Sequence, residues 1–142
     1  MRGLTYTAVA SCLLIAGCGG VHSPVGFRLP DNGDTERGQR AFTQLNCYEC
    51  HTVDGVELPE PRPGLPTVVA LGGPVREIRT DGYLVASIIN PSHRFARYPR
   101  EKVAVEGESR MPDYADKMTV RQLVDIVAFL QDRYRLLPPP TM

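Results

Sequence analysis

Two thiols and an imidazole lie close together in the pentapeptide Cys47-Tyr48-Glu49-Cys50-His51. A Cys-X-X-Cys-His pattern is the attachment site for c-type haem. The two thiols can form thioether bonds to the two vinyl groups of one porphyrin, and the next residue then lies beneath the iron, where histidine is a common axial ligand. The motif predicts one covalently attached haem c on Cys47 and Cys50, with His51 bound to the iron.

The same cysteine spacing has other uses in proteins. It can form a strained local disulfide, a thioredoxin-like redox pair or half of a zinc site. The surrounding sequence shows no strand-rich βαβ pattern for a redox pair and no second cysteine pair for zinc. Haem attachment is therefore favoured over these three readings.

A second axial ligand has to come from further along the chain, where Met111, Met118 and His93 are the plausible donors. Met111 precedes Pro112, which biases its backbone towards an extended conformation and helps a loop to present the side chain. Met118 lies just before a predicted helix cap, where an apolar residue usually packs as a staple. His93 follows a turn in an arginine-rich stretch and reads as a surface histidine. We predict Met111 as the second ligand.

Other side chains are expected to support such a site. The second ring nitrogen of His51 should donate a hydrogen bond to a backbone carbonyl, for which residues 63–66 are the candidates. Arginine pairs well with carboxylates, so one or two polar residues should bind the haem propionates. The candidates for that role are Arg76, Arg79, Tyr83, Asn90, Arg94, Arg97 and Tyr98.

Iron held between histidine and methionine has both axial positions filled. This ligand set raises the reduction potential relative to harder ligands. It leaves no open position for oxygen or a substrate, so such a site is suited to electron transfer.

Helices are predicted on either side of the motif by apolar residues at spacings of three and four. They span about 35–46, 82–89 and 120–134. Between them, the proline-rich stretch 53–73 and the long stretch 91–117 read as loops, with a short extended piece at 102–105. A structureless loop as long as the second is expected only where it has a function, and wrapping the open face of a haem is such a function.

The N-terminus has the features of an export signal. Arg2 precedes an uncharged, mostly apolar run over 4–16 that is too short to span a bilayer. The run ends in Ile15-Ala16-Gly17-Cys18, which resembles a bacterial lipobox. We predict a lipoprotein signal peptide over 1–17 and a lipid on Cys18. An ordinary signal peptide cleaved near Gly17 is the alternative.

Composition places further bounds on the chain. Residues 18–34 contain glycine, proline and an Asn-Gly pair without a helical period, and so read as a flexible tether. The folded domain is predicted over 35–136, followed by a tail over 137–142. The 16 basic and 16 acidic residues cancel, and no basic stripe points to nucleic acid.

Taken together, these residues resemble the mono-haem class I c-type cytochromes, in a bacterial lipoprotein form. The matching pattern is Gly38 and Phe42, the Cys-X-X-Cys-His motif, Met111-Pro112 and the apolar run 123–130. The resemblance implies an all-α fold of three to four short helices wrapped around one covalent haem, with long loops. It also implies that the first and last helices cross at Gly38 and Phe129. The stretch 93–107 is longer than in the smallest members.

The resemblance implies an electron carrier, not an enzyme. Its donor and acceptor would be membrane-bound or periplasmic redox proteins, and its haem domain would face the periplasm from a lipid anchor in a bacterial membrane. A haem sensor or a peroxidase-like enzyme with an open or labile sixth iron position is an alternative. A fixed electron-transfer subunit of a larger membrane complex is another.

Overall fold

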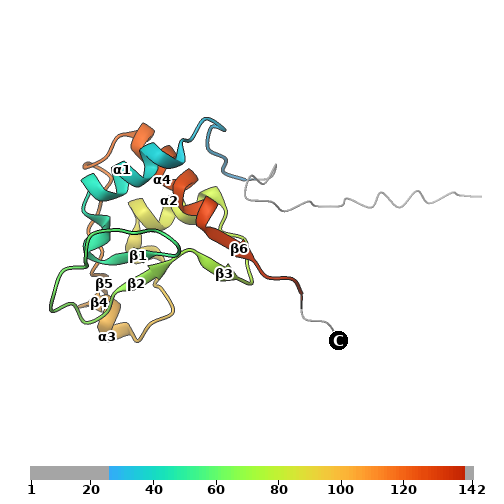
Figure 1. Cartoon of the computed structure of the whole chain (residues 1–142). Helices are drawn as coiled ribbons and strands as arrows, with labels where there is room; N and C mark the ends of the chain where they lie inside the picture. Colours follow the sequence, from blue (N-terminus) through green and yellow to red (C-terminus); the bar gives the residue numbers. More distant parts are fainter. Residues whose placement is uncertain (1–25, 140–142) are drawn as a thin grey trace, which may run out of the picture.

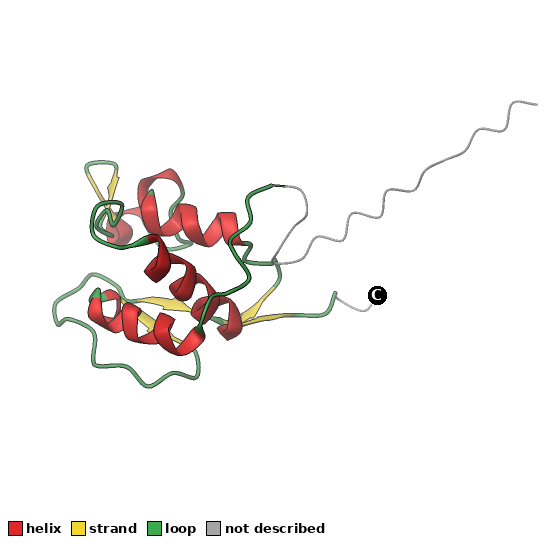
Figure 2. Ribbon diagram, turned by 90° about the horizontal axis from the view of Figure 1, so that it is seen from above, coloured by secondary structure: helices red, strands yellow, loops and turns green. Residues whose placement is uncertain are grey.

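The computed structural model describes residues 26–139, and this part of the chain forms short helices joined by long loops (Figures 1 and 2). Small two-stranded ladders lie between the helices. The helices are α1 (Thr35–Gln44), α2 (Asp81–Ile89), α3 (Arg100–Val103) and α4 (Val120–Arg133), with 3₁₀ turns η1 (Cys47–Glu49) and η2 (Pro91–His93). The strands are β1 (His51–Val53), β2 (Val69–Leu71), β3 (Gly73–Val75), β4 (Ala104–Val105), β5 (Glu108–Ser109) and β6 (Tyr134–Leu136).

The three predicted helices are confirmed as α1, α2 and α4, and each begins at a side-chain cap. The Asp34 carboxylate accepts the Arg37 N–H, and the Thr80 hydroxyl accepts the Tyr83 N–H. Thr119 forms a reciprocal capping box with Gln122. Such caps satisfy backbone donors that the first helical turn leaves without partners.

The first and last long helices, α1 and α4, pack directly against each other (Figure 1). Gly38 lies at this contact. A Cβ atom at this position would lie 2.6 Å from the Phe129 Cβ and would also clash with the backbone carbonyl of Asp125. The missing side chain therefore allows the two backbones to approach closely. The crossing of Gly38 with Phe129 that the family resemblance implied is confirmed.

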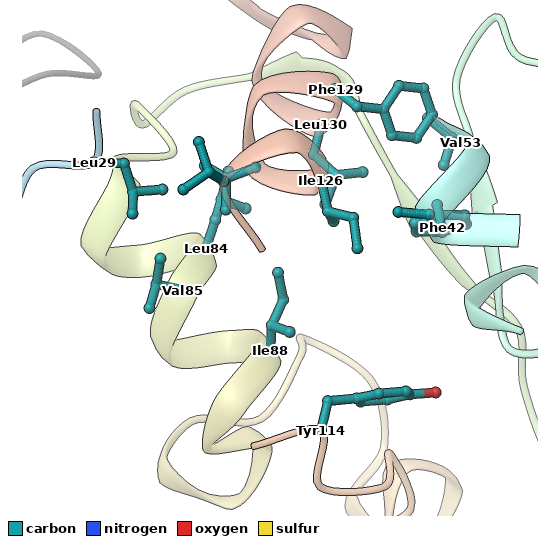
Figure 3. Packing of buried hydrophobic residues seen from close by; sticks show 13 residues of the cluster. Leu29, Phe42, Val53, Leu84, Val85, Ile88, Tyr114, Ile126, Phe129 and Leu130 are labelled. Atoms are coloured by element: carbon teal, nitrogen blue, oxygen red, sulfur yellow. The ribbon is translucent and has the colours of Figure 1, made fainter. Parts of the chain in front are cut away.

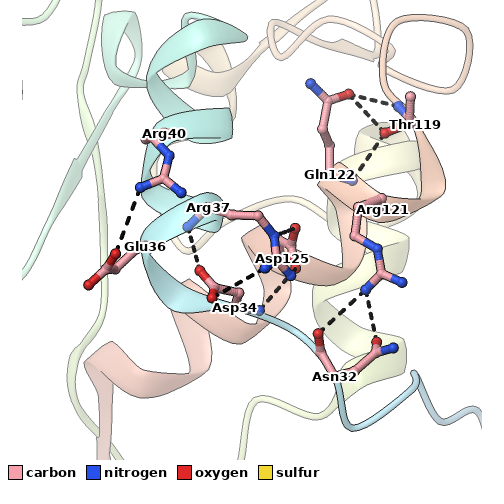
Figure 4. Close-up of polar contacts among 9 residues, drawn as sticks. All are labelled: Asn32, Asp34, Glu36, Arg37, Arg40, Thr119, Arg121, Gln122 and Asp125. Carbon is pink, nitrogen blue, oxygen red and sulfur yellow. Dashed lines mark hydrogen bonds and ion pairs between the residues drawn. The ribbon is translucent and has the colours of Figure 1, made fainter.

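A polar network fixes the same crossing from its edge (Figure 4). Asp125 on α4 is 2 % exposed and receives both the Nε and an Nη of Arg37 on α1, each at 2.9 Å. Its Oδ1 also accepts the Asp34 N–H at 2.9 Å. The carboxylate therefore joins α4 to the start of α1.

The apolar core lies where α1, α2 and α4 meet (Figure 3). Phe42 and Phe129 pack edge to face with ring centroids 5.7 Å apart. Leu84 and Ile88 contribute from α2, and Ile126 from α4. This core forms one wall of the cavity described below.

The strands are too short to be recognised from sequence. β1 pairs with β2 and β3 with β6, both in parallel, whereas β4 and β5 form an antiparallel hairpin. The extended piece predicted at 102–105 is half helix, because α3 ends at Val103 and only Ala104 and Val105 are strand. The all-α expectation thus holds for the main elements, with small ladders added.

The segment predicted as a tether over 18–34 lies partly outside the described residues, which begin at residue 26. From there the chain packs on the domain. Leu29 is buried in the core and donates its N–H to Asp81 at 2.8 Å, and Arg121 binds Asn32 at 2.8 Å. Of the predicted tail, Leu137 still donates its N–H to the Val75 carbonyl.

Candidate haem site

The cysteine pair lies where α1 has ended and the chain turns. Asn46 takes a left-handed backbone conformation with φ 57°, which asparagine tolerates better than most residues. This turn leads into η1 and on to His51. Cys47, Cys50 and His51 all line one cavity of about 460 Å³.

The ring of His51 is oriented by the first parallel ladder. His51 pairs with Val69, and its Nδ1 lies 3.2 Å from the Val69 carbonyl oxygen. When Nδ1 donates this bond, Nε2 is the nitrogen left to coordinate a metal. The acceptor is therefore Val69 and not a carbonyl of residues 63–66, because the β1–β2 register brings Val69 opposite His51.

Burial favours the form of the His51 imidazole that can bind a metal. It lowers the pKa of His51, which favours the neutral imidazole that a metal requires. Phe42 lies next to it, with ring centroids 6.5 Å apart. The imidazole is therefore held between a backbone acceptor and the core.

The Cys47 thiol does not have the properties of a reactive redox thiol. Cys47 and Cys50 are both free, and burial raises the pKa of Cys47 to about 11. Reactive Cys-X-X-Cys thiols have a lowered pKa. Within residues 26–139, no group of three or more His, Cys, Asp or Glu residues is placed to hold a metal ion, so a zinc site lacks the rest of its ligands.

The candidate second ligands differ in where the structure places them. Met111 and Met118 both line the cavity and are partly buried against the core. His93 is exposed, does not line the cavity, and bonds the Asn90 carbonyl through Nδ1 at 2.8 Å. Only the two methionines thus share a cavity with His51.

Tyr114 connects the loop after Met111 to the C-terminal end of α1. Its side chain is buried, and its hydroxyl donates to the Leu45 carbonyl at 3.2 Å. Burial raises its pKa to about 12, so the hydroxyl stays protonated and remains a donor. The loop is therefore tied to the end of α1.

The charged side chains that line the cavity are cationic. The cavity is lined by four cationic side chains and, within the part of the chain that the structure describes, by no Asp or Glu. The four are Arg62, Lys102, Arg110 and Arg94. A largely apolar cavity with cationic walls and thiol, imidazole and thioether groups fits a porphyrin that carries two carboxylates. The residues present thus fit a covalently attached haem.

Of the seven residues expected near the propionates, Tyr83 and Arg94 line the cavity. The Arg94 guanidinium lies 5.6 Å from the centre of the Tyr83 ring. The Arg79 guanidinium lies 4.7 Å from the same ring but does not line the cavity. The other expected residues do not line the cavity. They are Arg76, Asn90, Arg97 and Tyr98. Arg62, Lys102 and Arg110 were not expected, because nothing local in the sequence separates them from other surface cations.

None of the helices in the described range is both long and apolar enough to cross a bilayer.

A family model described as Cytochrome c matches residues 35–133. The match begins with the first residue of α1, ends with the last residue of α4 and includes the cysteine pair, His51 and Met111. A comparison with curated proteins gave no match.

Proposed function

The chain belongs to the cytochrome c family, and from this premise we propose that it is a membrane-anchored electron carrier whose haem iron is held between His51 and Met111. The family carries haem c covalently and transfers electrons, and the four helices with long loops agree with the class I fold. The proposal adds the ligand pair, the anchor and the partners.

One observation carries the ligand assignment. His51 has Nδ1 committed to Val69, and Met111 lies on the same cavity in a loop that is tied down on both sides. The haem supplies an iron that changes oxidation state by one electron. The chain supplies two ligands that suit both oxidation states and an apolar enclosure that keeps water from the iron.

Met118 is the competing thioether. It directly precedes the Thr119 cap of α4 and packs against the core, as expected for a staple residue. Met111 lies in the loop between the β4–β5 hairpin and Tyr114, with its backbone free of a helix. We therefore assign ligation to Met111 and packing to Met118.

The partners we propose are membrane-bound or periplasmic redox proteins that donate and accept single electrons. The lipid on Cys18 would hold the domain at a bacterial membrane, facing the periplasm. Cys18 lies outside the described residues, and the support for this anchor is the sequence around it. Contacts between such partners are small and short-lived, as repeated electron transfer requires.

The ligand assignment is tested by replacing each methionine in protein made with its haem attached. Met111→Ala should abolish the weak far-red absorption band of thioether-ligated ferric haem and lower the reduction potential, because a softer ligand is lost. Met118→Leu, which conserves volume, should keep the band and cost less than about 1.5 kcal/mol of stability.

A reversed pattern, in which Met118→Leu removes the band and Met111→Ala retains it, would reassign the ligand. A wild-type protein with a high-spin ferric spectrum would instead have an open sixth position. It would then favour a sensor or a peroxidase-like enzyme over an electron carrier.

A further inference from the structure

The β4–β5 hairpin directly precedes the loop that contains Met111. β4 and β5 pair Ala104 with Ser109 and Val105 with Glu108, around a turn in which Glu106 and Gly107 both have positive φ. This is the backbone of a tight two-residue hairpin turn. Ala104 is buried, so the hairpin is seated on the domain.

Ser92 joins this hairpin to η2, the turn directly after α2. Its hydroxyl donates to the Glu108 carboxylate at 2.7 Å and accepts the Ser109 N–H at 3.0 Å. A serine hydroxyl has one proton and two lone pairs. Because Glu108 takes the proton, a lone pair is directed to Ser109.

Ser109 passes this restraint on to the loop. Its own hydroxyl oxygen accepts the Met111 N–H at 3.1 Å. The chain of bonds therefore runs from η2, directly after α2, through Ser92 and Ser109 to the backbone of Met111. On the other side of Met111, Tyr114 is bonded to Leu45.

We propose that Ser92 is a positioning residue that holds Met111 against the iron through the β4–β5 hairpin. The inference rests on the proposed ligation by Met111 and explains what keeps that ligand in place. A thioether is neutral, so its hold depends on how firmly the protein fixes the loop that presents it. Each bond removed increases the fraction of molecules in which the methionine has left the iron.

Imidazole is a suitable probe, because it binds ferric haem only where the methionine has moved away. Its apparent dissociation constant is the intrinsic constant divided by the fraction of open molecules. Ser92→Ala and Ser109→Ala should each tighten imidazole binding by about threefold to tenfold, the factor expected for losing one or two hydrogen bonds. The far-red band should be retained without imidazole and disappear at lower imidazole concentrations than in the wild type.

Two further variants separate positioning from a general loss of stability. Ser92→Thr keeps a hydroxyl and should restore wild-type imidazole affinity. Thr43→Val removes a hydroxyl that bonds Gln39 within α1, far along the chain from this hairpin, and should leave the affinity unchanged. Global destabilisation alone would not tighten imidazole binding, since unfolded molecules stay rare under native conditions.

The inference is overturned if both alanine variants bind imidazole within about twofold of the wild type, or if Thr43→Val tightens binding as much as they do. A wild-type protein without the far-red band would overturn the ligand assignment first. The spectrum of the wild type therefore tests ligation by Met111, and imidazole binding by the variants tests the positioning role of Ser92.

Discussion

Gly38 is the residue at which one added methyl group should do most damage to the fold. The new Cβ of Gly38→Ala would meet the Asp125 carbonyl and lie 2.6 Å from the Phe129 Cβ, where both neighbours are held by α4. Overpacking of this kind costs about 1–3 kcal/mol or more. Chemical denaturation of the variant should show a loss of at least this size.

Gly82 provides the matched control in another helix. A Cβ there would lie 3.5 Å from the Phe27 Cβ, which is an ordinary contact, and the residue is already helical. Gly82→Ala should therefore stay within about 1 kcal/mol of the wild type, because alanine favours helix. Equal losses in the two variants would show that the α1–α4 approach is not the reason for the glycine.

The roles predicted for single residues of the site stay predictions, but the structure brings these residues together. The motif and the loop position of Met111 are legible in sequence, and the structure places both on one cavity. The predicted hydrogen-bond acceptor for His51 was wrong. The acceptor depends on the register of the three-residue β1–β2 ladder, and no local sequence pattern indicates that register. The cationic lining from Lys102 and Arg110 was missed for a similar reason, since only the folded loop brings these residues to the cavity.

At the scale of elements, the contact between α1 and α4 should make stability depend on pH. Hydrogen bonds from Arg37 hold the pKa of Asp125 below its usual value. The hydrogen bond from the Asp34 backbone N–H and the positive charge of Arg121 lower this pKa as well. The unfolded chain then binds a proton that the folded chain does not. The stability that the ionised Asp125 contributes to the fold is fully present above the unfolded pKa of about 3.9. It is lost as the pH falls through the lower pKa of the folded state.

Asp125→Asn removes this titration while keeping a similar shape. We expect the denaturation midpoint of the variant to be lower than that of the wild type at neutral pH, and the difference to narrow as the pH falls below about 4. Midpoints measured across that range check the sign. Parallel curves would mean that Asp125 does not contribute to acid sensitivity.

The segment before α1 behaves as part of the domain. Leu29 is 9 % exposed within the core, and its N–H is bonded to the buried Asp81. Leu29→Ala should cost about 2 kcal/mol or more. Phe27 is 57 % exposed, so Phe27→Ala should change stability by about 0.5 kcal/mol or less. If the Leu29 variant were as stable as the wild type, the segment before α1 would belong to the predicted flexible tether and not to the folded domain.

Elements differ in how far the sequence predicts them. The long helices carry caps and apolar spacing, and so α1, α2 and α4 begin within a residue or two of the expected positions. The ladders of two or three residues carry no such period. β3 and β6 pair only because α4 delivers Tyr134 beside Gly73, which is a property of the closed fold.

For the whole molecule, the proposed anchor is open to a direct test. With a lipid on Cys18, the mature protein should partition into the detergent phase of a phase-separating extract, because acyl chains add a large apolar surface. Cys18→Ala, exported with its haem, should move to the aqueous phase with an unchanged absorption spectrum. Aqueous partitioning of the wild type would favour an ordinary cleaved signal.

The packing of α1 against α4 also bears on the order in which the molecule is made. α4 is the helix furthest along the chain from the cysteine pair, and it packs on α1, the helix just before that pair. If the polypeptide crosses a membrane with its N-terminus leading, both thiols emerge while α4 is still behind. The pentapeptide is then accessible to an attachment enzyme on an open chain, and the fold can close afterwards around a porphyrin that is already bonded.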